Sequence, residues 1–518
     1  MNLTQAIRDR NLFGGMFKNP QTWHAWEIYL SALFGLPIDA ADMGLFRQCT
    51  NLTRPPAGRA RESFVICGRR SGKSFISSII SVYLACFKDW TPYLSPGERG
   101  WIFVIANDKS QAGIIKKYIS GILHGTRLLK AKVQNETKEE IELSGSVGIA
   151  VKTSSYRTLR GYTLLAAILE EMAFYRSEDS ANPDREILAA VRPALATIPE
   201  SVLLGISTPY SRTGVLWEQY KANFGKEGGP LIWLAPTRTM NPTIDARLIE
   251  NAIKEDPQAA RAEWEAEWRE DIEAFITAEL VEAVMIPGRY ELPKIDGPDY
   301  FGFIDPSGGR QDAFTMGICH REGSGKIVLD VLRERRPPFQ PKGVVAEFAD
   351  VLKSFKVSSV ESDKYAGEWV PEAFREHGIT VKNSELTASE LYLNFLPLIS
   401  NGSVELLDNK RLLAQLVGLE RRTRSGGKDL ITHFPGGHDD LANAAAGVCV
   451  KASKLGGRFV FAFSDRPVYG LELDEDPDLE MLREMSRDDE VNWAKPTGPA
   501  RPRPPVLTTN DIPRRDRG

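Results

Sequence analysis

The chain has 518 residues, of which 42% are hydrophobic and 26% charged, and its formal net charge is −4. At roughly 150 residues per core this length predicts two or three domains, and the slightly acidic balance excludes a globally basic nucleic-acid binder, although local basic patches can still bind phosphates. The five cysteines are widely spaced without a C-x-x-C pair, and no stretch approaches the roughly 18 apolar residues of a membrane span, so we expect a reduced, soluble protein without membrane association.

Residues 20 to 40 form the first periodic segment of the chain. Their apolar residues recur at helical spacing and end on Gly35, which predicts an amphipathic helix that packs on a core. An alternative is that Gln21 or Trp23 helps to seat an adenine base.

Residues 64 to 75, with the sequence FVICGRRSGKSF, are typical of a phosphate-binding loop between a strand and a helix. Backbone N–H groups of the loop can surround a phosphate, Lys73 can neutralise it, and the Ser74 hydroxyl can ligate Mg²⁺. In the motif G-x-x-x-x-G-K-[ST] the first glycine would fall at Cys67, and Gly68 follows one residue later. The predicted nucleotide-binding residues are Gly68, Arg69, Arg70, Ser71, Gly72, Lys73 and Ser74, with ATP and Mg²⁺ as the expected ligands.

The following segments alternate between strands and helices. We expect strands at 100–107, 164–171 and 201–209, with a helix at 111–123, and therefore a parallel sheet with helices on both faces.

Two of these strands end in polar residues. Glu170 and Glu171 end one strand downstream of the loop, where the first acid is expected to hold Mg²⁺ and the second to polarise the attacking water. The usual pair is Asp-Glu, so Glu170 is a departure, and a solvated turn is the alternative. Ser207 and Thr208 end another strand and are expected beside the phosphates.

The segment between the two expected domains is charged. Residues 247–274 predict a helix with Trp264 and Trp268 on one face, and the Pro- and Gly-rich residues 284–299 indicate a boundary. We therefore predict a first domain at 1–280, a linker at 281–298, a second domain at 299–455 and a disordered tail at 456–518.

The second domain is predicted to carry acids on three separate segments. Three antiparallel strands start near residue 300, and the first ends at Asp305; a later parallel strand ends at Asp363, with Glu361 as the competitor; Asp439 and Asp440 precede a small-residue helix. Such an arrangement begins an RNase H-like sheet, and converging carboxylates can hold two divalent ions about 4 Å apart for phosphodiester cleavage. The alternatives are a turn former at Asp305 and a helix N-cap at Asp439.

A basic stretch lies between these acids. Residues 411–428 are interpreted either as a basic β-hairpin that contacts DNA phosphates or as a solvated charged loop. Its cations are Arg411, Arg421, Arg422, Arg424 and Lys428.

The order of these motifs resembles the large terminase subunits of tailed bacteriophages, the motors that pump DNA into a procapsid. The resemblance spans approximately residues 20 to 450 and is carried by RRSGKS, by LRG ahead of the Glu-Glu strand, by STP ahead of a GVLW helix, and by the three acid segments. It implies a RecA-like (ASCE) P-loop ATPase domain followed by an RNase H-like nuclease domain.

The resemblance also implies roles and partners. Arg160 would be an arginine finger acting in its own or a neighbouring subunit, with Arg69 and Arg70 as alternatives, or it would merely pair with a surface carboxylate. The expected partners are double-stranded DNA, the portal protein, the small terminase subunit and further copies in a pentameric ring. The nuclease would use two Mg²⁺ or Mn²⁺ ions, and the protein would work in the host cytoplasm, transiently on the procapsid and absent from the virion.

Two other functions fit parts of the pattern. A helicase-nuclease of repair or restriction would need a second RecA-like domain, for which only one helical stretch remains after Ser207. A P-loop scaffold or DNA-binding regulator would have no metal-dependent cutting.

Overall fold

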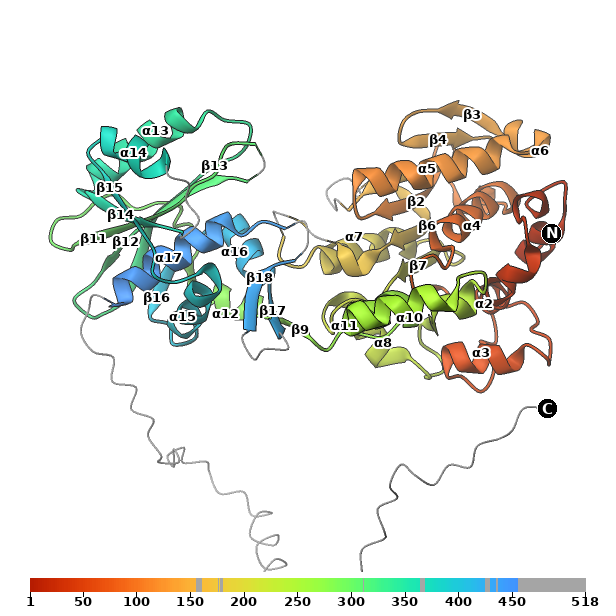
Figure 1. Cartoon of the computed structure of the whole chain (residues 1–518). Coiled ribbons are helices and arrows are strands. Elements are labelled where there is room, and N and C mark those ends of the chain that lie inside the picture. The colour runs from red at the N-terminus through yellow and green to blue at the C-terminus, as the bar shows by residue number, and fades with distance from the viewer. Residues whose placement is uncertain are drawn as a thin grey trace, which may run out of the picture. The chain divides into compact units, whose positions relative to one another are not determined.

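The computed structural model describes residues 1–154, 161–175, 177, 180–310, 312–363, 369–423, 429–434 and 437–454. Arg160, Arg424, Lys428 and the tail at 456–518 lie outside these ranges, and the predictions made for them stay predictions. The described residues form two large sheets, each with its own helices (Figure 1).

The first sheet has eight strands in the order β3-β4-β5-β2-β6-β7-β1-β8. The six strands from β5 to β8 in this order run parallel, and the antiparallel β3 and β4 extend one edge. The strands are β1 (Glu62–Cys67), β2 (Gly100–Ala106), β3 (Val133–Glu136), β4 (Glu140–Leu143), β5 (Val147–Thr153), β6 (Thr163–Glu170), β7 (Val202–Ser207) and β8 (Leu231–Ala235). The predicted parallel sheet is confirmed.

Helices cover both faces of this sheet. They are α1 (Leu3–Arg8), α2 (His24–Phe34), α3 (Met43–Thr50), α4 (Lys73–Phe87), α5 (Lys109–His124), α6 (Arg127–Lys130), α7 (Pro183–Ala196), α8 (Gly214–Asn223), α9 (Thr237–Met240), α10 (Ala246–Glu255) and α11 (Pro257–Glu265). Short 3₁₀ turns are η1 (Gly14–Met16), η2 (Pro20–Trp23), η3 (Thr91–Tyr93) and η5 (Met172–Phe174).

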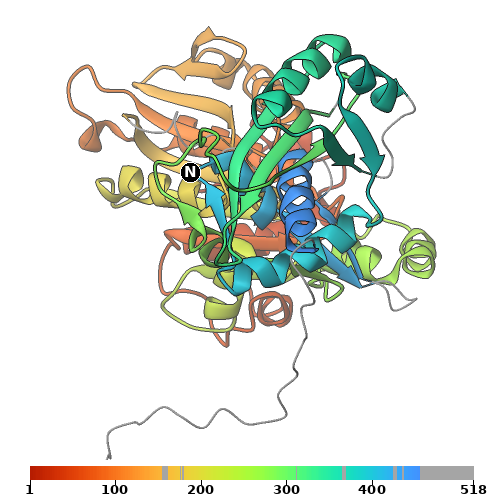
Figure 2. The same cartoon turned by 90° about the vertical axis from the view of Figure 1, so that its left-hand side faces the viewer.

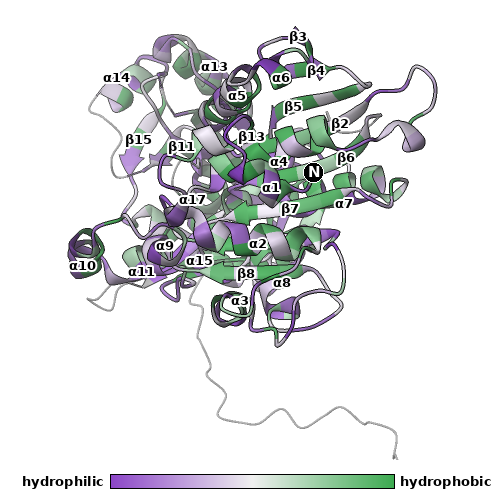
Figure 3. Ribbon diagram, turned by 90° about the vertical axis from the view of Figure 1, so that its right-hand side faces the viewer, coloured by the Kyte–Doolittle hydropathy of each residue, from purple (hydrophilic) through white to green (hydrophobic). Residues whose placement is uncertain are grey.

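Side-chain alternation along the strands builds two cores in this domain. In β1, Val65 and Cys67 pack with α2, α4 and α5, whereas Phe64 and Ile66 pack on the other face with α7 and α8. Figure 3 shows the strands of this sheet as predominantly hydrophobic. Each large apolar side chain buried in this way stabilises the fold by about 1.5–3 kcal/mol.

The predicted helix at 20–40 is confirmed as η2 and α2. It ends at Gly35, whose φ of 64° closes the helix in the left-handed conformation that glycine adopts without steric cost. Trp26 and Tyr29 are fully buried, as expected for a helix that packs on a core.

The single helix predicted at 247–274 is wrong, because the structure divides the segment. Asp256 is extended ahead of Pro257, which cannot continue a helix hydrogen-bond ladder, so α10 and α11 are separate. Ala266, with φ of 58°, ends α11 and leaves Trp268 outside any helix, where its ring packs on Trp217. Trp264 and Trp268 therefore do not share one helical face.

The second large sheet has seven strands in the order β10-β16-β13-β12-β11-β14-β15. As predicted for an RNase H-like sheet, β11, β12 and β13 are antiparallel and β14 and β15 run parallel to β11. The strands are β10 (Met285–Ile286), β11 (Tyr300–Asp305), β12 (Phe314–Arg321), β13 (Ile327–Arg335), β14 (Ser359–Ser362), β15 (Thr380–Asn383) and β16 (Val404–Leu407).

Helices pack on both faces of this sheet as well. They are α12 (Ala278–Glu282), α13 (Pro341–Ser354), α14 (Trp369–Glu376), α15 (Ala388–Ser400), α16 (Lys410–Val417) and α17 (Asp440–Lys454). Helices α13 and α14 cover one core, and α15, α16 and α17 cover the other. Figure 2 shows α17 in blue lying along the green strands of the sheet.

The second core begins earlier in the sequence than residue 299. Ile276, Val281 and Val284 pack in it, and β10 pairs with β16. Residues assigned from sequence to the end of the first domain and to the linker thus contribute apolar side chains to this core.

A small third sheet contains the predicted hairpin. Strands β17 (Leu419–Thr423) and β18 (Asp429–His433) are antiparallel, and β9 (Ile272–Ala274) pairs with β17. Arg411 was wrongly included in the hairpin; it lies in α16, and its guanidinium is paired with Glu334 at 2.8 Å. None of the helices in the described ranges combines the length and apolar character needed to cross a membrane.

Candidate functional site

The loop from Gly68 to Gly72 joins β1 to α4 in the way that the sequence predicts. Gly72 has φ of 89°, and a Cβ atom there would lie 2.6 Å from the Trp23 ring, so both its backbone and its surroundings require glycine. Position 68 also requires glycine, because a side chain there would collide with Thr237 and with the Glu263 carbonyl. Cys67 instead stays in the strand and is buried.

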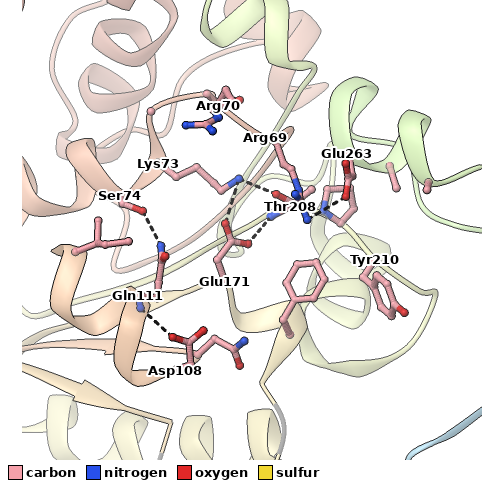
Figure 4. Close-up of a pocket in the computed structure, with 18 of the residues that line it drawn as sticks. Arg69, Arg70, Lys73, Ser74, Asp108, Gln111, Glu171, Thr208, Tyr210 and Glu263 are labelled. Carbon is pink, nitrogen blue, oxygen red and sulfur yellow. Dashed lines mark hydrogen bonds and ion pairs between the residues drawn. The ribbon is translucent and has the colours of Figure 1, made fainter. Parts of the chain in front are cut away.

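Lys73 is the centre of this site. It is 6% exposed, and its Nζ donates to Thr208 Oγ1 at 2.7 Å and forms an ion pair with Glu171 at 3.3 Å (Figure 4). Burial opposes its charged form, but the neighbouring Glu171 and Glu170 raise its pKa above the ordinary value. A fully charged ammonium group is thus held where the loop and two strand ends meet.

Glu170 ends β6 and Glu171 follows it, and one strand, β7, lies between β6 and β1. Glu170 is fully buried and accepts hydrogen bonds from the hydroxyls of Ser74, at 3.1 Å, and Ser77. Glu171 adopts φ of 52° and accepts from the backbone N–H of Thr208 at 3.2 Å. The burial of Glu170 disagrees with the alternative of a solvated turn.

Three helices supply contacts that the sequence analysis missed. Gln111 of α5 donates to the Ser74 hydroxyl at 3.1 Å. Thr237 and Asn241 donate to the loop carbonyls of Arg69 and Arg70 at 2.9 and 2.8 Å, and Glu263 pairs with Arg69 at 3.0 Å. The contact of Ser77 with Glu170 was also missed. Ser77 follows Ser74 by three residues, which places both on one helical face, so this contact could have been predicted. The other contacts have no local signal in the sequence.

An aromatic group lies beside the loop. The rings of Phe17, Trp23, Phe75 and Tyr118 pack edge to face or tilted, with centroids 5.2 to 5.9 Å apart. Trp23 and Phe75 line a pocket together with Gly72. A role of Trp23 or Gln21 in seating a base stays a prediction, and Gln21 is exposed.

Glu170 gives the stability of the fold a pH dependence. Burial raises the pKa of Glu170 from 4.5 to about 7, so the folded state holds the proton more tightly than the unfolded chain. The stability that this carboxyl contributes is therefore present below pH 4.5 and is lost as pH rises to about 7.

Glu170→Gln, which stays neutral, should raise the melting temperature at pH 8 and leave it nearly unchanged at pH 5, without nucleotide or divalent ions. Thermal unfolding at both pH values measures this effect, with Glu250→Gln, an exposed acid of α10, as the matched control. Equal shifts of the melting temperature at the two pH values would show that Glu170 is not buried as described.

The second group of acids meets at one end of the RNase H-like sheet. Ile304 pairs with Ser362 in the parallel β11–β14 register, so the next residues, Asp305 and Asp363, follow side by side. Opposite Asp305, Thr315 of β12 donates its hydroxyl to the Asp440 carbonyl at 2.7 Å. This bond fixes the start of α17 at the same place.

Charge crowding at this end of the sheet is severe. Burial, and then Asp440, Asp363 and Asp439, raise the pKa of Asp305 well above its ordinary value. Burial, followed by Asp439, raises the pKa of Asp440 to about 6. The competitor Glu361 instead faces the Lys451 ammonium at 3.7 Å.

Two buried polar residues hold these acids and were missed from sequence. Tyr392 of α15 donates to Asp439 Oδ2 at 2.9 Å, and Asn443 of α17 donates to Asp305 Oδ2 at 2.9 Å. Asn443 follows Asp439 by four residues, so its position on the same helical face was a readable signal. Tyr392 has no such local signal.

The donor set fits hard divalent cations. No three His, Cys, Asp or Glu side chains in the described residues already stand in a ligating arrangement. Carboxylate and amide oxygens are nevertheless the ligands that Mg²⁺ and Mn²⁺ prefer, and such ions would relieve the repulsion among the acids. The buried Oδ1 of Asn443 has no hydrogen-bond partner among the described residues. The predicted ligands remain Asp305, Asp363, Asp439 and Asp440.

The cations of the hairpin are partly neutralised. Arg421 pairs with Asp429 at 3.2 Å, and Arg422 pairs with Glu420 at 2.9 Å. Contact with DNA phosphates therefore stays a prediction, because these arginines would have to exchange carboxylate for phosphate partners.

No model of a known protein family matches the chain, and no protein of curated function is similar to it in sequence. Among solved structures, the HK97 bacteriophage large terminase is 16% identical, covers 80% of this chain and 95% of its own, and gives a TM-score of 0.35. The ATPase domain of the Thermus phage P74-26 large terminase is 19% identical, with coverage of 46% and 98% and a TM-score of 0.34. The large terminase nuclease of thermophilic phage G20c is 16% identical, with coverage of 34% and 97% and a TM-score of 0.30.

Proposed function

We propose that the chain is the large terminase subunit of a tailed bacteriophage, which hydrolyses ATP to translocate double-stranded DNA into a procapsid and cleaves concatemeric DNA. The observation that carries this proposal is the presence of two sites in one chain. A phosphate-binding loop with the buried Lys73 precedes an RNase H-like sheet whose acids converge at Asp305.

ATP hydrolysis follows from the residues around the loop. Lys73 would exchange its contacts with Thr208 and Glu171 for the β and γ phosphates. This exchange frees the Glu171 carboxylate, which would then orient the attacking water. Ser74 and Glu170 would hold Mg²⁺, which neutralises the phosphate charge when bound.

DNA cleavage follows from the acid cluster. Asp305, Asp363, Asp439 and Asp440 would hold two Mg²⁺ or Mn²⁺ ions, which activate a water and stabilise the leaving oxygen when bound. Tyr392 and Asn443 would keep two of these carboxylates oriented. Cutting of this kind has no built-in sequence preference, because phosphates carry no base information.

We further propose the partners that such a motor requires. They are double-stranded DNA, the portal protein of the procapsid, the small terminase subunit and further copies of this chain in a pentameric ring. The protein would act in the host cytoplasm and leave the procapsid before the virion matures.

In vitro packaging tests this function. Purified protein, portal-containing procapsids and the small subunit are mixed with linear duplex DNA and ATP, and nuclease-protected DNA is measured. ATP-dependent protection supports the proposal. Strand separation without protection would instead identify a helicase-nuclease, an alternative that the antiparallel β11–β13 strands disfavour because a second motor domain would be a parallel sheet.

Glu171→Gln should permit ATP binding but block hydrolysis, because the amide cannot polarise the water as the carboxylate does. Glu170→Gln should mainly raise the Mg²⁺ concentration needed for hydrolysis. Binding of a fluorescent ATP analogue and phosphate release together measure both effects. Small and equal effects of the two substitutions on hydrolysis would mean that neither glutamate has its proposed role.

A further inference from the structure

Asn443 lies next to the acid cluster, and the packing of its side chain does not explain why an asparagine stands there. It lies in α17, is 4% exposed, and follows Ala442 and precedes Ala444, which are fully buried and apolar. Its Nδ2 donates to Asp305 Oδ2 at 2.9 Å. An amide therefore occupies a buried position of α17 between two buried alanines.

The second half of this amide is unsatisfied. Asn443 Oδ1 is buried and has no hydrogen-bond partner among the described residues. Burying an unpaired acceptor costs stability, so an apolar residue of similar size would serve packing better at this position. The amide thus requires a reason other than the stability of α17.

We propose that Asn443 is a positioning residue of the nuclease site, which fixes the Asp305 carboxylate for divalent metal. This inference rests on the proposed nuclease function. Metal-ligating carboxylates are commonly held by such neighbouring donors, whose loss lowers metal affinity about 10- to 100-fold.

Tyr392 supports the same reading from a different element. It is fully buried, and its hydroxyl donates to Asp439 Oδ2 at 2.9 Å. Two of the converging acids are therefore each oriented by one buried neutral donor, and neither donor adds charge to a site already crowded with carboxylates. Neutral donors of this kind hold the acids in place without competing for the ions.

The test uses Asn443→Leu, which keeps the branching of the side chain but removes the hydrogen bond, in the full-length protein. Thermal unfolding is followed while Mn²⁺ is titrated, and DNA cutting is measured over the same concentrations. We expect the metal-free melting temperature to stay the same or rise. The Mn²⁺ concentration for half-maximal thermal stabilisation should increase about 10-fold or more, with cutting reduced at low Mn²⁺ and partly recovered at high Mn²⁺.

Two further variants keep the result interpretable. Asn443→Ala, which suits the alanine-rich helix, should show the same loss of Mn²⁺ affinity if the leucine variant folds poorly. Cys449→Ala, a buried change farther along α17, should lower stability without changing the Mn²⁺ dependence.

The outcomes separate this inference from the nuclease proposal. One outcome is that Mn²⁺ stabilises wild type but not Asp305→Asn, while both Asn443 variants titrate like wild type. This result would overturn the positioning role of Asn443 and leave the nuclease proposal standing. If wild type shows neither metal-dependent stabilisation nor cutting, both proposals fail.

Discussion

Lys73→Ala should abolish ATP hydrolysis and DNA packaging while metal-dependent DNA cutting persists. Lys73 is the buried cation that faces both Glu171 and the loop carbonyls, and its ammonium is expected to stabilise the phosphate charge that develops during transfer. Removing a single preorganised donor of this kind typically lowers turnover about 100- to 1000-fold. Phosphate release in the presence of DNA measures the loss directly.

The control for this change lies on the same helix. Lys88 caps the opposite end of α4 and pairs with Glu200, so Lys88→Ala removes a cation of the same element away from the loop. Because Lys73→Ala also leaves Glu171 without its counter-charge, the melting temperature of each variant must be recorded. Hydrolysis close to wild type in a folded Lys73→Ala protein would refute the nucleotide site.

Asp305→Asn should eliminate DNA cleavage and leave ATP hydrolysis intact. Asp305 ends β11, which lies between β12 and β14, and burial together with Asp440, Asp363 and Asp439 raises its pKa. Replacing it by an amide removes one ligand charge, so both the binding of divalent ions and the cleavage they support should fall to background. Relaxation or linearisation of plasmid DNA with Mn²⁺ gives the readout.

Glu361→Gln is the matched control, since Glu361 lies in β14, two residues before Asp363, and faces Lys451. We expect this variant to cut DNA like wild type and to keep Mn²⁺-dependent thermal stabilisation. If Asp305→Asn cuts as well as Glu361→Gln does, the acids of this sheet are not a nuclease site.

The features that were predictable from sequence are those written in consecutive residues. The run from Phe64 to Ser74 encodes a strand, a glycine loop and a helix start in one short segment, and Asp305 ends an apolar run that could only be a buried strand. The two sheets, with their parallel and antiparallel parts, follow from such local patterns and from the handedness of strand connections. The acids at the ends of these strands could be located because each directly follows a local apolar run.

The contacts that escaped prediction are made across long separations. Thr237, Asn241 and Glu263 reach the loop only because α9 and α11 pack against it, more than 160 residues away in the case of Thr237. No periodicity or motif records such a contact. By contrast, the break at Pro257 was readable, because the residue before a proline avoids helical geometry.

The same contacts have a thermodynamic consequence. The backbone N–H of Arg69 donates to the Glu263 carbonyl at 2.5 Å, and the Thr237 hydroxyl donates to the Arg69 carbonyl at 2.9 Å. A ligand that rearranges the loop therefore also changes the free energy of local opening of residues 237–265. By linkage, a factor that orders this segment changes the affinity for the ligand to the same extent. Amide hydrogen exchange in α11, measured with and without nucleotide, would read out the occupancy of the loop from a segment that contributes no residue to the predicted phosphate-binding motif.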